Sequence, residues 1–114
     1  MISKPITVVR TKPFERDVSS IWDEDELDEF VDFIARNPET GSVIPETGGV
    51  RKVRWSRQGS GKRGGVRVIY FHYDGEHPLY LIAIYAKAQK EDLSPAGKRA
   101  ARGFVAALKA QWKR

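Results

Sequence analysis

The sequence contains no cysteine, which excludes a disulfide framework and a cysteine-based zinc site. Its two histidines, His72 and His77, belong to no metal-ligand spacing such as HExxH, so we expect no metal. No apolar run approaches the roughly 20 residues needed to span a bilayer, and residues 1–5 lack the apolar core of a signal peptide. We therefore expect a cytoplasmic protein with no membrane partner.

Motifs for two other chemistries are also missing. The chain has no local motif for a serine–histidine–carboxylate triad. The stretch Gly59-Ser60-Gly61-Lys62 is similar to part of a phosphate-binding P-loop, but it precedes a predicted strand instead of opening a helix. The sequence thus gives no reason to expect a nucleotide or any other cofactor.

Charge is distributed unevenly along the 114 residues. Residues 1–48 carry 5 basic and 11 acidic side chains, whereas residues 49–114 carry 15 basic and 4 acidic ones. Seven cations share a 17-residue stretch that has no acidic residue, namely Arg51, Lys52, Arg54, Arg57, Lys62, Arg63 and Arg67. Such a cluster attracts a polyanion. The apolar share of 40% is typical of a folded protein, and we expect one domain over residues 1–114.

Residue periodicity predicts the order of the secondary-structure elements. We expect a strand at residues 6–9, a helix over residues 14–22, and a second helix that begins at the acidic turn 23–26 and ends at Asn37-Pro38. After a loop at residues 39–49 come strands at residues 52–55, 66–73 and 79–85, and a helix from Ser94-Pro95 to Trp112. The order β-α-α-β-β-β-α indicates an α+β domain, with helices on one side of a small, twisted, mostly antiparallel sheet.

Alternation within the first of these three strands separates cations from apolar residues. Lys52 and Arg54 share one strand face, and we expect the other face, with Val53 and Trp55, to be buried. If the strands pair in order, Arg67 and Lys87 join the cationic face and complete a phosphate-sized pocket. Arginine suits such a pocket because its planar fork donates two hydrogen bonds to phosphate oxygens.

Further candidates surround this group of cations. Arg51, Arg57, Lys62 and Arg63 are expected around the pocket, and Tyr85, two residues before Lys87, is a candidate for stacking on a base. Any one exposed cation on a strand is ordinary solvated surface. The complete run, with seven cations and no anion, favours binding of a polyanion.

Several stretches together carry a resemblance to a known family. They are Asn37-Pro38, Gly48-Gly49-Val50-Arg51-Lys52-Val53-Arg54, Gly61-Lys62-Arg63-Gly64-Gly65-Val66-Arg67-Val68-Ile69-Tyr70, Tyr80-Leu81-Ile82-Ala83-Ile84-Tyr85-Ala86-Lys87 and Asp92-Leu93. In this combination, over about residues 21–112, the chain resembles the RelE superfamily of toxins, and within it the HigB-type branch.

The resemblance implies a RelE-like fold and a ribosome-dependent endoribonuclease that cuts messenger RNA in the vacant A site. It also implies a cognate antitoxin, a HigA-like helix-turn-helix protein that binds the operon's DNA. RelE-like toxins work with cations on the second strand, an arginine that starts the third and a basic residue that ends the fourth. Lys52, Arg54, Arg67 and Lys87 hold these positions here. RelE proper follows its last strand with a Lys-Arg pair and a tyrosine, where this chain has Lys87-Ala88 and Leu93, so the general acid is unassigned.

Cleavage of RNA without a metal can proceed by attack of the ribose 2′-hydroxyl on the neighbouring phosphate, which needs a base, an acid and charge stabilisation. A lysine crowded by cations loses its proton more readily, so we expect Lys52 as the base. Arg54 and Arg67 would hold the phosphate, and Lys87 would assist charge or proton transfer. Two alternatives remain: a ParE-like toxin that inhibits DNA gyrase, and an RNA-binding module without activity.

Overall fold

The computed structural model describes residues 4–56, 65–87 and 92–113. The elements are β1 (Val8–Arg10), α1 (Lys12–Val18), α2 (Glu24–Arg36), β2 (Ser42–Val43), β3 (Val50–Trp55), β4 (Val66–Phe71), β5 (Leu79–Ala86) and α3 (Pro95–Trp112). The observed order matches the predicted one, apart from β2, which lies in a segment that we expected to be a loop. The α+β class is confirmed.

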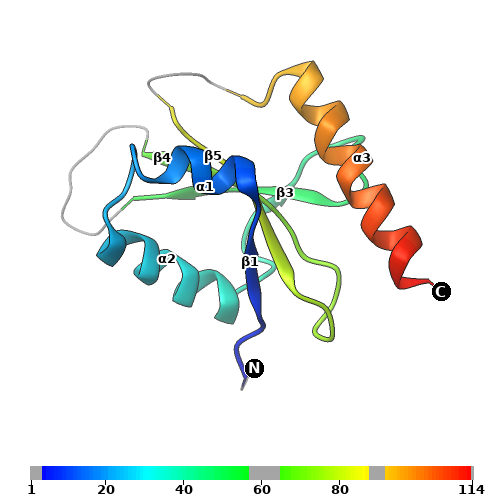
Figure 1. The fold of residues 1–114 in the computed structure, drawn as a ribbon, viewed down its shortest axis with the longest axis horizontal. Helices are drawn as coiled ribbons and strands as arrows, with labels where there is room; N and C mark the ends of the chain where they lie inside the picture. The colour runs from blue at the N-terminus through cyan, green and yellow to red at the C-terminus, as the bar shows by residue number, and fades with distance from the viewer. Residues whose placement is uncertain (1–3, 57–64, 88–91, 114) are drawn as a thin grey trace.

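All five strands form one sheet in the order β1-β5-β4-β3-β2 (Figure 1). β1 runs parallel to β5, and the three other pairings are antiparallel. β4 and β5 therefore lie inside the sheet. The register of this pair shifts at one point. Ile69 is opposite Ala83, but the next residue, Tyr70, is opposite Leu81. Ile82 is thus an extra residue in β5, and such a bulge changes which later residues face each side.

The helix starts follow the signals in the sequence. Asp23 and Glu26 form a capping box at the start of α2, with the Asp23 carboxylate accepting from the Glu26 backbone N–H at 2.8 Å. The Ser94 hydroxyl accepts from the Gly97 N–H at 3.0 Å at the start of α3. Thr11 instead donates its hydroxyl hydrogen bond to the Leu81 carbonyl oxygen at 2.9 Å, which fastens the start of α1 to β5. None of the helices within the described ranges is long and apolar enough to cross a bilayer.

Helices cover both faces of the sheet, and our prediction that they share one side was wrong for α3. Val68 and Tyr70 of β4 belong to the core that includes residues of α1 and α2, whereas Ile69 and Phe71 belong to the core that includes residues of α3. All four side chains are buried. A strand that is apolar on both faces requires cover on both, so the unbroken run in β4 was the signal for this arrangement.

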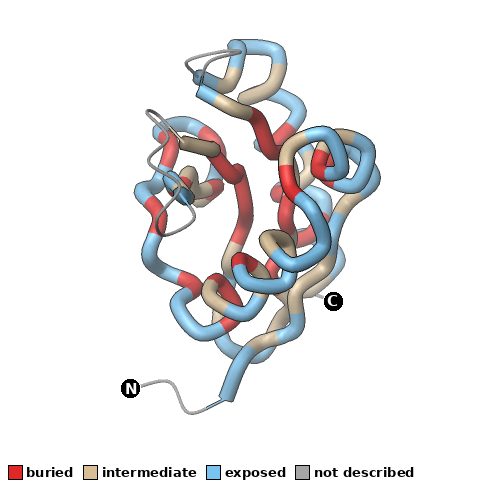
Figure 2. Tube along the Cα trace, turned by 90° about the vertical axis from the view of Figure 1, so that its left-hand side faces the viewer, coloured by how far each residue is buried: buried red, intermediate tan, exposed pale blue. Residues whose placement is uncertain are grey.

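The buried residues follow this two-sided packing. Figure 2 shows them concentrated along the strands in the middle of the molecule and on the inward sides of the helices. Between α2 and β3, Ile44 is buried, whereas Val43 is 53% exposed and does not join the core.

The hydroxyl group of Tyr70 attaches the segment after α2 to the sheet. It donates to the Pro38 carbonyl oxygen at 2.8 Å and accepts from the Gly41 backbone N–H at 2.9 Å. Arg51 strengthens the attachment, because its guanidinium donates to the Gly41 carbonyl oxygen at 2.7 Å. The Tyr70 side chain is fully buried, so no water replaces these bonds.

Replacement of Tyr70 by phenylalanine tests this attachment. Tyr70→Phe keeps the buried ring but leaves the Gly41 N–H without its acceptor, so the free energy of unfolding should fall by about 1–3 kcal/mol. Urea unfolding measures the loss, and Tyr80→Phe, on the partly buried Tyr80, is the control. Equal losses in the two variants would contradict the role of this hydroxyl.

Candidate nucleic-acid interface

Strand pairing places two arginines next to each other on the sheet face that α3 covers. Arg54 of β3 is directly opposite Arg67 of β4, and Arg67 is directly opposite Tyr85 of β5. Arg67 alternates with Ile69, and Tyr85 is itself part of the core on the α3 side. Directly opposed residues have Cβ atoms about 5 Å apart, so the side chains of this row are neighbours.

Lys52 lies on the same face, two residues before Arg54 and two after Val50, which packs in the α3-side core. Its Nζ is 2.7 Å from the Oδ1 atom of Asp92. The hydrogen bond and charge of Lys52 lower the pKa of Asp92, so this carboxylate is ionised at neutral pH. Three of the four cations predicted to share a face, Lys52, Arg54 and Arg67, therefore do so.

The two arginines differ in their exposure to solvent. Arg67 is only 7% exposed, whereas Arg54 is exposed. Like charges directly opposite each other on neighbouring strands destabilise a sheet. An anion between the two guanidinium groups would offset this repulsion. The arrangement is thus suited to a phosphate group.

Tyr85 closes the row on the β5 side. Burial raises the pKa of its hydroxyl, against the charges of Lys52 and Arg67, which lower it. The group is therefore a neutral phenol near neutral pH. Only 4% of the residue is exposed, so the ring belongs to the core and presents no open face for stacking on a base.

The remaining predicted residues are placed as follows. Lys87 directly follows β5, is exposed, and donates its backbone N–H to the Gly65 carbonyl oxygen at 3.2 Å. The structure does not bring Arg51 to this group, because alternation in β3 turns it to the other face, where it binds backbone oxygens of the segment after α2. Arg57, Lys62 and Arg63 lie outside the described residues.

Sequence reasoning missed Asp92 as part of the site. In the sequence analysis Asp92 appears only in the stretch Asp92-Leu93 of the family resemblance, and 40 residues separate it from Lys52. No spacing rule joins residues so far apart in the chain. Only the pairing of strands and the start of α3 reveal the contact.

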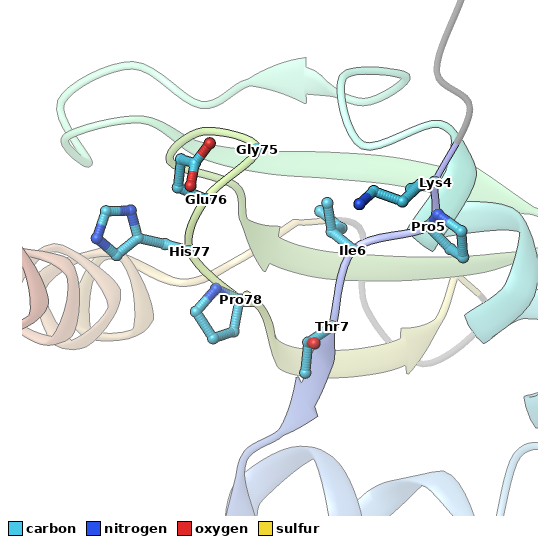
Figure 3. A pocket seen from close by; sticks show the side chains of 8 residues that line it. All are labelled: Lys4, Pro5, Ile6, Thr7, Gly75, Glu76, His77 and Pro78. Atoms are coloured by element: carbon cyan, nitrogen blue, oxygen red, sulfur yellow. The ribbon is translucent and has the colours of Figure 1, made fainter.

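Two hollows lie away from these cations. One, of about 230 Å³, lies between residues 4–7 and the turn 75–78 (Figure 3), where the imidazole of His77 points away from the hollow. His77 instead contacts the Asp74 carboxylate at 2.8 Å and the ring of Trp112. His77 follows the end of β4 that is farther from Arg67. The second, an apolar groove of about 400 Å³, lies between α3, β5 and the start of α1. Within the described part of the chain, no group of three or more metal-ligating side chains is present.

Comparisons with known proteins find a family model and solved structures to which this chain is similar. Residues 7–113 match the family model described as the RelE toxin of the RelE/RelB toxin–antitoxin system. The fold is similar to that of a double mutant of the E. coli toxin RelE in the free state, with a TM-score of 0.56 and 11% identity over 77% of this chain and 90% of that one. A copper-bound mutant toxin from Helicobacter pylori matches with a TM-score of 0.41 and 16% identity over 74% of this chain and 97% of that one.

The opposed arginines lead to a prediction about anions. Arg54→Gln removes one of two like charges, so it should raise the free energy of unfolding in chloride by about 0.2–1 kcal/mol. Inorganic phosphate should stabilise the wild type more than the variant, because a ligand that binds only the folded state raises stability by mass action.

Thermal unfolding in chloride and in phosphate at equal ionic strength measures both effects. Arg102→Gln, at an exposed position of α3, is the matched control. If phosphate stabilises the Arg54→Gln protein and the wild type equally, Arg54 is no part of an anion site.

Proposed function

The chain belongs to the RelE family of toxins from toxin–antitoxin systems, and from this premise we propose that it is an endoribonuclease that cleaves messenger RNA in the ribosomal A site. The observation that carries the proposal is the row of Arg54 and Arg67 beside Lys52 on one sheet face. Within the family we assign the chain to the HigB-type branch, on the stretches of sequence that resemble it.

The proposed reaction is attack of a ribose 2′-hydroxyl on the adjacent phosphate, without a metal. Negative charge develops on the phosphate oxygens as the new bond forms, and fixed donors aimed at those oxygens lower the barrier. Arg67 suits this task because burial holds its guanidinium in place and strengthens its electrostatic interactions. Arg54 lies opposite Arg67 and supplies a second guanidinium group, so that both arginines bind the same phosphate.

Proton transfer is assigned to the groups around this pair. Lys52 is the proposed base, and in the free protein its Nζ is 2.7 Å from the Asp92 carboxylate, so that contact has to open before Lys52 meets the substrate. Lys87, exposed at the end of β5, assists charge or proton transfer. The neutral hydroxyl of Tyr85 lies where the charges of Lys52 and Arg67 act on it, but its oxygen is buried, so we assign Tyr85 no contact with the RNA.

Partners follow from the same proposal. A toxin of this family implies a neutralising antitoxin, which we propose is a HigA-like helix-turn-helix protein. The ribosome and its messenger RNA are the proposed substrate complex, and the protein acts in the cytoplasm. Arg57, Lys62 and Arg63 are proposed to contact ribosomal or messenger RNA, which their charge favours regardless of base sequence.

Cleavage in a programmed ribosome tests the proposed roles. Arg67→Lys keeps the buried charge but loses the two-pronged contact, and Lys87→Gln removes the charge at the end of β5. Removal of one preorganised donor to a developing oxyanion costs about 100-fold or more in rate. Primer extension should therefore show both variants cutting far more slowly than the wild type, and Arg102→Gln cutting at the wild-type rate.

Other outcomes would contradict the proposal. If expression of the protein arrests growth and damages DNA while messenger RNA stays intact, the protein is a gyrase inhibitor. Salt-sensitive binding of RNA without growth arrest would identify a binding module that lacks activity. Undiminished cleavage by both folded variants would remove Arg67 and Lys87 from the mechanism.

A further inference from the structure

The ion pair between Lys52 and Asp92 places an anion inside the cationic face. The two residues lie in distant parts of the sequence, and their side chains are 31% and 67% exposed. Asp92 comes two residues before Ser94, which caps α3. Ion pairs this exposed contribute little to folding stability, so a stabilising role does not explain the contact.

The carboxylate accepts a hydrogen bond from Lys52, as a phosphate oxygen could do. Its distance of 2.7 Å from Nζ is that of a charge-assisted hydrogen bond between an ammonium ion and an anionic oxygen. A phosphate bound in the row of Arg54 and Arg67 would bring a second anion next to the same ammonium group. Two adjacent anions repel, so entry of the phosphate and the contact with Asp92 oppose each other.

We infer that the Asp92 carboxylate is a built-in competitor for the RNA phosphate: it holds Lys52 in the free protein and leaves Lys52 when the phosphate binds. The inference rests on the proposed function and assigns to Asp92 a role in limiting RNA affinity. It also gives Lys52 two states, a donor to Asp92 before RNA binds and a group free to meet the substrate afterwards.

The test uses the affinity of the full chain for a single-stranded 2′-O-methyl RNA of about 12 nucleotides, which has no 2′-hydroxyl to attack phosphate. Asp92→Asn keeps the shape and an oxygen acceptor but removes the charge. Fluorescence anisotropy should show about two- to fivefold tighter binding by this variant, the range expected when no exposed ion pair has to break. The plot of log affinity against log salt should steepen by up to about 0.7, the value for one phosphate contact on a single strand.

Asp32→Asn is the matched control. It makes the same change in net charge and breaks an exposed pair of the same kind, between Asp32 and Arg36 on α2 at 3.1 Å. Its RNA affinity and salt dependence should stay close to those of the wild type. A double-mutant cycle adds a second readout, because Asp92→Asn should lose most of its effect when Lys52 is already replaced by alanine.

The outcomes separate the two proposals. If the wild type binds the RNA while Asp92→Asn and Asp32→Asn change affinity equally, the inference is overturned and the RNA site stands. The same holds if the effect of Asp92→Asn persists in full without Lys52. If none of the proteins binds the RNA even at 25 mM salt, roughly the range where phosphate contacts are strongest, the RNA site itself fails and the inference with it.

Discussion

Burial of β4 on both faces is the constraint on which the arrangement of the molecule depends. Its residues alternate between a core shared with α1 and α2 and a core shared with α3, so neither face tolerates solvent. On the α3 side the strand begins with Arg67 and continues with Ile69 and Phe71. The apolar residues pack in the α3-side core, and the arginine is left at the end of the strand beside the cations of β3. Position along a doubly buried strand thus fixes where the charged site lies.

Pairing with the neighbouring strands then assembles the site. β3 brings Lys52 and Arg54 to this face, and β5 brings Tyr85. Each side chain is fixed by a strand of the sheet, which holds a site more precisely than a loop does. Like charges are costly in such a row, and among the described residues the Asp92 carboxylate reaches Lys52. The electrostatics therefore favour an anionic ligand over a bare surface.

Much of the fold was predictable from local patterns. The acidic turn before α2 and Ser94-Pro95 before α3 mark true helix starts, because both place groups that satisfy the first N–H donors of a helix. Alternation in β3 correctly separated Lys52 and Arg54 from Val53 and Trp55. The cationic face was predictable for the same reason, since a period of two and pairing in order determine which side chains share a face.

Other features depended on long-range packing. The unbroken apolar run of β4 is visible in the sequence and indicates burial on both faces. The prediction of helices on one side of the sheet ignored this run, and so it placed α3 on the wrong face. The bulge at Ile82 and the two-residue strand β2 leave no periodic signal because they are too short. Arg51 was expected beside the pocket on charge alone, whereas its bonds to the Gly41 and Glu39 carbonyl oxygens hold it on the opposite face.

The proposed cleavage depends on Arg54 and Arg67 holding one RNA phosphate together. Nuclear magnetic resonance of the arginine Nε–Hε groups, recorded while a non-cleavable RNA is added, tests it most directly. The largest shift changes should belong to Arg54 and Arg67, with little change at Arg99 and Arg102 on the exposed side of α3. Shift changes confined to those α3 arginines, with none at Arg54 and Arg67, would contradict it.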